Sequence, residues 1–88
     1  MKKEKVIFIF ESIHQVLKAE KALDKAGESF DIIPVPKEIN PECGMALEVD
    51  PKKKEQIHEV LKTANIKIRT IYNRQGSLFM EMKSWLGS

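Results

Sequence analysis

Cys43 has clear nucleophilic potential, and it is the only cysteine among the 88 residues. It lies between Glu42 and Gly44 in the proline-bearing segment PKEINPECG, at positions 36–44. A thiolate can attack a persulfide or selenide donor and keep the transferred atom. Two interpretations stay open from the residue type: an activated thiol, or a small buried or inert cysteine. Glu42 works against thiolate formation, because a neighbouring carboxylate disfavours a second negative charge.

The other polar candidates fit structural roles better. His14 and His58 fall on separate predicted helices that start at opposite ends of the sheet, so they do not complete a metal site with Cys43. Glu20 is typical of a rim carboxylate paired with a lysine, and the lysines at 52–54 of a solvated helix face. No phosphate loop, paired-carboxylate site or Ser–His–Asp set can be assembled. We therefore predict no metal and no other cofactor.

Composition excludes several classes of protein. With 15 basic and 13 acidic residues and a net charge of +2, the chain lacks the charge excess of a dedicated nucleic-acid binder. No apolar run approaches the roughly 20 residues that cross a bilayer. The N-terminus, MKKEKV, lacks the apolar stretch of a signal peptide. We expect a cytoplasmic protein with no membrane segment.

Four strands are predicted. Residues 6–10, VIFIF, are apolar throughout, which favours a central strand covered on both faces. Residues 30–35 form an edge strand, because Pro34 cannot donate a ladder hydrogen bond. Residues 45–49 alternate as a third strand, and residues 66–72 alternate as an amphipathic strand at the other edge.

Two helices separate these strands. The first is predicted over residues 12–26, from Ser12 as N-cap to a stop at Gly27. The second begins at Asp50-Pro51 and ends near Asn65, which tolerates a left-handed conformation. The apolar positions that we expect to be buried recur at helical spacing: Ile13, Val16, Leu17 and Leu23 in the first helix, and Ile57, Val60, Leu61 and Ala64 in the second.

This order of elements predicts an α+β fold, a ferredoxin-like βαββαβ sandwich with an antiparallel sheet of order 4-1-3-2. Residues 1–73 form the predicted domain, and residues 74–88 form an apolar C-terminal extension. The helical spacing of the extension predicts a short helix on the uncovered sheet face or an interface segment, with a homodimer contact as one interpretation. The positions that carry this spacing are Leu78, Met82, Trp85 and Leu86.

This topology positions Cys43. The connection between the second and third strands lies at the same end of the sheet as the start of the first helix, so Cys43 is predicted to face the backbone N–H groups after Ser12. The partial positive charge there lowers a thiol pKa below its usual value of about 8.5. Lys37, in the same connection, adds a cation.

The segment PVPKEINPECG resembles the small selenium/sulfur carrier-like proteins of bacteria, over about residues 5–72. An apolar first strand that ends near a serine and the Ala19-Glu20-Lys21 segment add to the resemblance. It implies that Cys43 accepts sulfur or selenium as a persulfide or selenosulfide from a protein donor, such as a cysteine desulfurase, and passes it to a protein acceptor.

The resemblance thus favours a carrier over an enzyme with its own turnover. We assign binding roles around Cys43 to four residues: Gly44, Lys37, Ser12 and Asn40. The family commonly has Arg and Ser at positions 37 and 40, so Lys37 keeps the positive charge without the guanidinium fork.

Two other functions were weighed. The main alternative is a non-catalytic regulatory or protein-interaction module of the same fold, in which Cys43 is incidental. A thiol reductase is disfavoured, because the chain contains no second cysteine to resolve a mixed disulfide.

Overall fold

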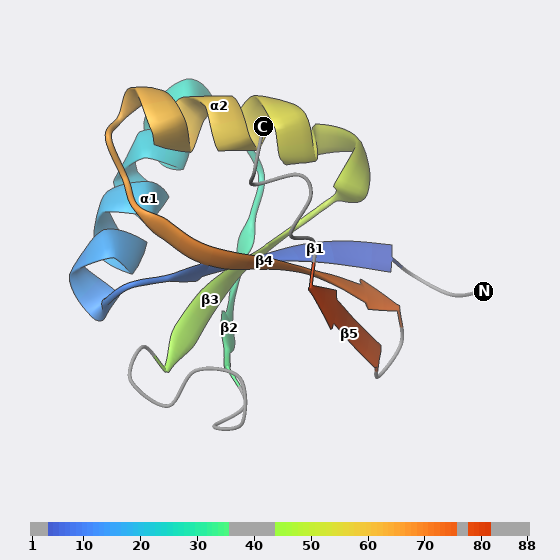
Figure 1. Cartoon of the computed structure of the whole chain (residues 1–88). Helices are drawn as coiled ribbons and strands as arrows, with labels where there is room; N and C mark the ends of the chain where they lie inside the picture. Colours follow the sequence, from blue (N-terminus) through green and yellow to red (C-terminus); the bar gives the residue numbers. More distant parts are fainter. Residues whose placement is uncertain (1–3, 36–43, 76–77, 82–88) are drawn as a thin grey trace.

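The structure, a computed structural model, describes residues 4–35, 44–75 and 78–81 (Figure 1). A single 3₁₀ turn, Pro51–Lys53, leads directly into the second helix. The elements in chain order are β1 (Glu4–Phe10), α1 (Ile13–Ala26), β2 (Asp31–Pro34), β3 (Met45–Val49), α2 (Lys54–Thr63), β4 (Ile68–Gln75) and β5 (Leu78–Glu81).

The strands form one antiparallel sheet in the order β2-β3-β1-β4-β5. The α+β class, two helices with an antiparallel sheet, is as the sequence predicted. Read from β4, the first four strands follow the predicted order 4-1-3-2. The observed sheet differs because a fifth strand, β5, pairs with the outer side of β4. The prediction of β2 as an edge strand is confirmed.

The C-terminal part of the sheet corrects two predictions. β4 is not an edge strand, because it lies between β1 and β5. Residues 78–81 form a strand and not a helix, because Leu78 of β5 pairs with Gln75 of β4 in an antiparallel ladder. A Gly-bearing dipeptide between two strands is a hairpin signal, and here it prevailed over the helical spacing of the apolar residues. Residues 82–88 of the predicted extension lie outside the described residues.

The helix ends follow the capping residues that the sequence indicated. Ser12 is the N-cap of α1, and Gly27 ends it in the left-handed conformation at φ 75°. The Asp50 carboxylate accepts a 2.9 Å hydrogen bond from the Lys52 backbone N–H and so caps the turn before α2. Asn65 adopts φ 64° after α2, as predicted. These local signals fix where each helix begins and ends.

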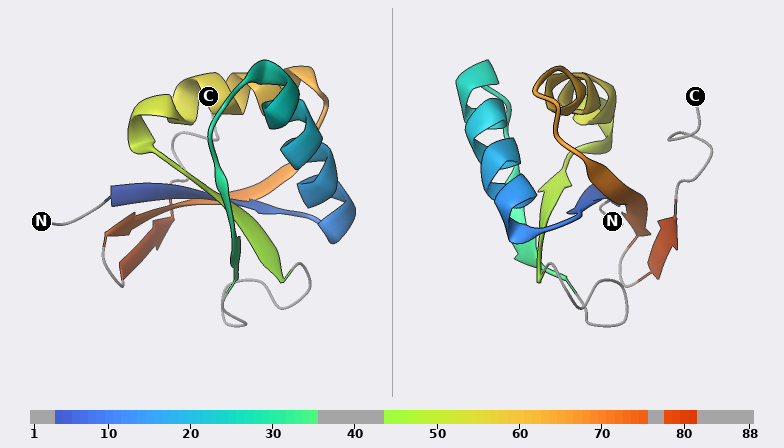
Figure 2. Two further views of the ribbon diagram at one scale, coloured as in Figure 1. Left: turned by 180° about the vertical axis from the view of Figure 1, so that it is seen from behind. Right: turned by 60° about the vertical axis from the view of Figure 1, so that its left-hand side comes forward.

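Both helices cover the same face of the sheet, as Figure 2 shows. β1 is the central strand, and Val6 to Phe10 are all buried, so the prediction of a strand covered on both faces is confirmed. The larger cluster joins the helices to one sheet face and includes Val6, Phe8, Phe10, Leu23, Leu47, Ile57, Leu61 and Ile71. A smaller cluster on the opposite face contains Ile7, Ile9, Val35 and Ala46.

The helical stripes are narrower than predicted. Val16, Ala19 and Leu23 of α1 are buried, whereas Ile13 and Leu17 are 42% and 50% exposed. Each residue turns a helix by about 100°, so a residue one position beyond the buried stripe can point into solvent. Of the four α2 positions predicted to be buried, Ile57 and Leu61 are buried, Val60 is half-buried and Ala64 is exposed.

Candidate functional site

The predicted site is only partly within the described residues. Cys43, Lys37 and Asn40 lie outside them. Ser12 and Gly44 are described: Ser12 precedes α1, and Gly44 precedes β3. The structure therefore shows the start of α1, at Ser12, and the start of β3, at Gly44.

The strand register brings these two flanks to one end of the sheet. Ile9 of β1 pairs with Ala46 of β3, and Phe10 pairs with Ile68 of β4. The last residues of β1 therefore lie beside the first residues of β3 and β4. Ser12 lies two residues after the end of β1, and Gly44 directly precedes β3, so both lie at this end of the sheet (Figure 1).

Gly44 closes the base of the connection between β2 and β3. Its carbonyl oxygen accepts a 3.1 Å hydrogen bond from the Val35 backbone N–H, one step beyond the last paired residues of the two strands. Gly44 has φ 77°, and a Cβ added there would meet no atom of the described residues within 4 Å. The position thus favours glycine because of its backbone conformation and not because of crowding.

Ser12 places the positive end of the α1 dipole at the same end of the sheet. Its carbonyl oxygen accepts hydrogen bonds from the N–H groups of Gln15, at 3.1 Å, and Val16, at 3.3 Å. Its side chain forms no capping hydrogen bond, and the first turn contains no acidic residue. The N–H groups of Ile13 and His14 come before the first helical carbonyl acceptors, so they carry the partial positive charge of the helix terminus.

A contact that sequence analysis did not predict holds this helix end in place. The Gln15 side-chain oxygen accepts a 3.1 Å hydrogen bond from the Lys67 backbone N–H. Gln15 is in the first turn of α1, and Lys67 directly precedes β4. This hydrogen bond ties the start of α1 to the sheet end that also carries Gly44. No periodicity in the sequence indicates a bond across 52 positions.

The sheet face opposite the helices carries a charged pair that the sequence analysis also missed. Glu48 of β3 is buried, and its Oε2 lies 2.6 Å from the Arg74 Nη2 of β4. Ile7 of β1 pairs with Glu48 on one side and Tyr72 on the other, so the ion pair reaches across the central strand. Among the residues that the structure describes, Glu48 Oε2 and Arg74 Nε have no well-aligned hydrogen bond, so the pair is a close ionic contact rather than a bidentate one.

A second polar cluster joins the start of β1 to the end of β4. The Glu4 Oε2 accepts hydrogen bonds from the side-chain amides of Asn73, at 2.8 Å, and Gln75, at 3.2 Å. The Asn73 hydrogen bond first, and the Gln75 hydrogen bond second, lower the pKa of the Glu4 carboxyl below its usual value. Hydrogen bonds to the ionised form favour that form.

The histidines and Glu20 lie apart from one another. His14 is exposed on α1, His58 is half-buried on α2, and Glu20 is half-buried in the middle of α1. Within residues 4–35, 44–75 and 78–81, no three His, Cys, Asp or Glu side chains are grouped as metal ligands. In the same part of the chain, no helix is long and apolar enough to cross a membrane.

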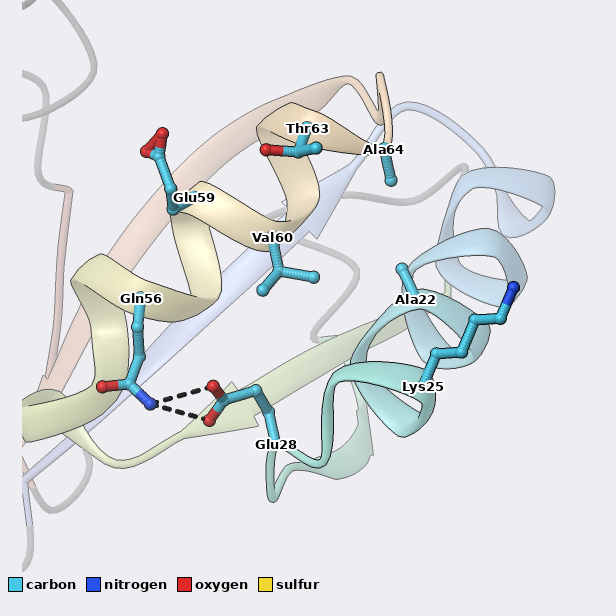
Figure 3. Close-up of a pocket in the computed structure, with 8 residues that line it drawn as sticks. All are labelled: Ala22, Lys25, Glu28, Gln56, Glu59, Val60, Thr63 and Ala64. Atoms are coloured by element: carbon cyan, nitrogen blue, oxygen red, sulfur yellow. Dashed lines mark hydrogen bonds between the residues drawn. The ribbon is translucent and has the colours of Figure 1, made fainter.

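A groove of about 510 Å³ lies between α1 and α2 (Figure 3). Ala22, Val60 and Ala64 point into it, and the Gln56 Nε2 donates to both Glu28 carboxylate oxygens, at 3.0 and 2.9 Å, across one end. None of the residues that line it is a cysteine or a histidine. It lies along the second half of α1, away from Ser12, so it is not the predicted thiol site.

Comparison with known proteins identifies the family of the chain. A sequence profile of the family described as "Putative Se/S carrier protein-like" matches residues 5–73, which include Cys43. A curated protein of Aquifex aeolicus (strain VF5), named "Putative sulfur carrier protein", is 40% identical over 78 residues, which cover 86% of this chain. The chain spans about two fifths of the length of that relative, 40%. No solved structure matches the chain. The chain belongs to the Se/S carrier protein-like family.

Proposed function

We propose that the protein carries sulfane sulfur on Cys43, as a persulfide, between a protein donor and a protein acceptor. The observation that best supports this is the strand register, which brings Gly44, the neighbour of Cys43 in sequence, to the sheet end where α1 begins. Membership of the carrier-like family supports the same direction. Selenium, held as a selenosulfide, is the other cargo that we propose for the same thiol.

The proposed transfer needs no external oxidant or reductant. The Cys43 thiolate attacks the outer sulfur of a donor persulfide, R–S–SH. A new S–S bond forms to Cys43, the S–S bond of the donor breaks, and the donor leaves as a thiolate with the electron pair of that bond. Cys43 then holds the group –S–SH. Delivery to an acceptor thiolate is the same exchange, with Cys43 as the leaving thiolate.

We infer that the α1 terminus favours the thiolate that this chemistry requires. The N–H groups after Ser12 carry partial positive charge, and no first-turn carboxylate opposes it. Gly44 provides the left-handed turn after Cys43. Lys37 would attract an anionic donor group, and Asn40 would bind it by hydrogen bonds.

The partners that we propose follow from this chemistry. A cysteine desulfurase is the proposed donor, and an enzyme whose thiolate takes over the sulfane sulfur, or selenium at the same oxidation level, is the proposed acceptor. We further propose a cytoplasmic location, where thiols stay reduced. A homodimer through the C-terminal segment stays a prediction.

We also propose that the fold is ferredoxin-like, with β5 as an addition. The element order βαββαβ and the antiparallel pairings β2-β3, β3-β1 and β1-β4 support this assignment.

Mass spectrometry of the intact protein tests the proposal. After incubation with inorganic polysulfide, or with a cysteine desulfurase and cysteine, the wild-type chain should gain the mass of a sulfur atom on the Cys43 peptide, and dithiothreitol should remove it. The Cys43→Ser variant should gain none. Equal loading of wild type and variant would contradict the proposal and leave the interaction module as the better account.

A further inference from the structure

The outer surface of the helix layer has an apolar centre. α1 and α2 cover one face of the sheet, and their outer sides form a surface of the molecule (Figure 2). The groove of about 510 Å³ between them has a floor of Ala22, Val60 and Ala64 (Figure 3). Because apolar surface gains free energy when it leaves water, this floor favours contact with another apolar surface.

The two rims of the groove carry opposite charges. Lys25 of α1 lines one rim and Glu59 of α2 lines the other, and both are exposed. Neither side chain forms an ion pair or a hydrogen bond with another residue that the structure describes. Glu28, the other acid in the lining, is held at one end of the groove by the two hydrogen bonds from Gln56. The groove therefore offers one cation and one anion, on opposite sides of an apolar floor.

The outer side of α1 is basic beyond this rim as well. A helix turns by about 100° per residue, so the side opposite the buried stripe of α1 can be read from the sequence. The residues on that side are His14, Lys18, Lys21 and Lys25, all exposed. The two acids of α1, Glu20 and Asp24, are each two positions from Ala22. They therefore lie on the side of the helix away from the groove and from α2.

The outer side of α2 is acidic. Glu55 and Glu59 lie opposite the buried residues Ile57 and Leu61, and at a spacing of four they are neighbours on the helix surface. Lys62 is two positions from Val60, so it lies on the flank of α2 away from the groove. The lysines at 52–54 come before Gln56, which closes one end of the groove. The helix layer is thus divided into a basic half and an acidic half.

We propose that this surface binds a second copy of the chain, with α1 of each copy over α2 of the other. A two-fold axis along the groove gives this arrangement, in which the two apolar floors meet. Lys25 lies between Ala22 and Glu28 in sequence, and Glu59 lies between Gln56 and Thr63, so both are near the middle of the groove. Lys25 therefore meets the partner's Glu59, and the symmetry repeats this contact.

Charge complementarity selects the second copy and its orientation. A surface with a basic half and an acidic half complements itself about an axis along the groove, and ion pairs then surround an apolar centre as in other protein interfaces. An axis across the groove would place the lysines of the two α1 helices against each other, which like-charge repulsion disfavours. The basic and acidic halves thus select one of the two symmetric arrangements.

This interface leaves the proposed thiol site free. With the axis along the groove, α1 runs in the same direction in both copies. Ser12 and Gly44 of the two copies therefore lie at one end of the dimer, outside the contact. No residue of the proposed carrier site takes part, so the inference does not rest on the proposed function. It also differs from a contact through the C-terminal segment.

Reversal of the two rim charges tests the interface by sedimentation equilibrium in the presence of dithiothreitol. Lys25→Glu and Glu59→Lys should each raise the Kd of the wild-type dimer about tenfold, because the symmetry turns two attractive contacts into two repulsive ones. An equimolar mixture of the two variants should associate with about the wild-type Kd. Each contact in the mixed dimer again joins a lysine to a glutamate.

Matched charge reversals outside the interface serve as controls. Lys62→Glu on the flank of α2 and Asp24→Lys on the far side of α1 should both keep the wild-type Kd. Cys43→Ser should keep it too, since the contact needs no sulfur. Amide NMR spectra check that each variant keeps its fold, and reassociation of the mixture shows the same for the two rim variants.

Four results would overturn the proposed interface. The first is a wild-type chain that stays monomeric up to about 1 mM, where even weak complexes form. The second is an unchanged Kd in both rim variants, and the third is a mixture that fails to associate. The fourth is a dimer that Trp85→Ser/Leu86→Ser abolishes and the rim variants do not. Failure of Cys43 to load sulfur would overturn the proposed function and leave the interface as it is.

Discussion

The two faces of the sheet are held together by different interactions. On the helix-covered face, Phe8 and Phe10 of β1 are fully buried against aliphatic side chains of both helices. On the opposite face, Ile7 and Ile9 lie in a smaller cluster, and the Glu48–Arg74 ion pair reaches across the same strand. Apolar burial is non-directional and tolerant, whereas a buried charge requires its partner. The comparison indicates that the first face supplies most of the stability and the second restricts how β3, β1 and β4 align.

The largest effect should come from the helix-covered face. Phe8→Ala removes a fully buried aromatic ring and leaves a cavity between the sheet and the helices. We expect the free energy of unfolding to fall by about 3–5 kcal/mol. Urea denaturation followed by circular dichroism measures it. A loss below about 1 kcal/mol would show that this face is not the principal core.

A smaller loss is expected when the ion pair is broken. Arg74→Ala leaves the Glu48 carboxylate buried without a cation, and because the Arg74 side chain is 30% exposed we expect a loss of about 1–3 kcal/mol. The double variant Glu48→Leu/Arg74→Met removes both charges and should lie within about 1 kcal/mol of wild type. If the double variant were as unstable as the single one, packing rather than charge would explain the effect.

The smallest effect concerns the Glu4 cluster, where the start of β1 lies beside the end of β4. Asn73→Ala should raise the pKa of Glu4 toward its usual value, because it removes the hydrogen bond that lowers it most. Gln75→Ala should raise it less. A lowered native pKa means that Glu4 stabilises the fold above its unfolded-state pKa and that this contribution is lost as the pH falls through the native pKa. Carboxyl-carbon NMR titration measures the shift. An unchanged Glu4 pKa in both variants would show that these hydrogen bonds do not lower it.

Sequence patterns predicted the features that depend on local chemistry. The run VIFIF, Pro34 in an edge strand, the Asp50-Pro51 start and the left-handed Asn65 all correspond to the structure. The features that the sequence analysis missed depend on distant partners or on a choice between two patterns. Residues 78–81 carried helical spacing and a hairpin signal together, and pairing with β4 decided between them.

In the candidate site, too, the features set by local chemistry could be predicted and those set by distant partners could not. Ser12 as N-cap and Gly44 at positive φ could be predicted from residue type, and their meeting at one sheet end followed from the topology. The hydrogen bond from Lys67 to Gln15, which joins the start of α1 to β4, could not be predicted, because nothing local links the two residues. The exposure of Ile13 and Leu17 was also missed, because a stripe in a sequence does not show how wide the buried face is.

The central claim is that Cys43 is an ionised, accessible thiol at the sheet end where α1 begins. The rate of its alkylation by iodoacetamide, followed against pH with Cys43→Ser as the blank, tests this claim most directly. The account predicts a midpoint well below the value of about 8.5 for an ordinary cysteine. A thiol that stays unreactive up to a pH of about 9 would contradict it, because a buried neutral sulfur cannot accept or deliver cargo.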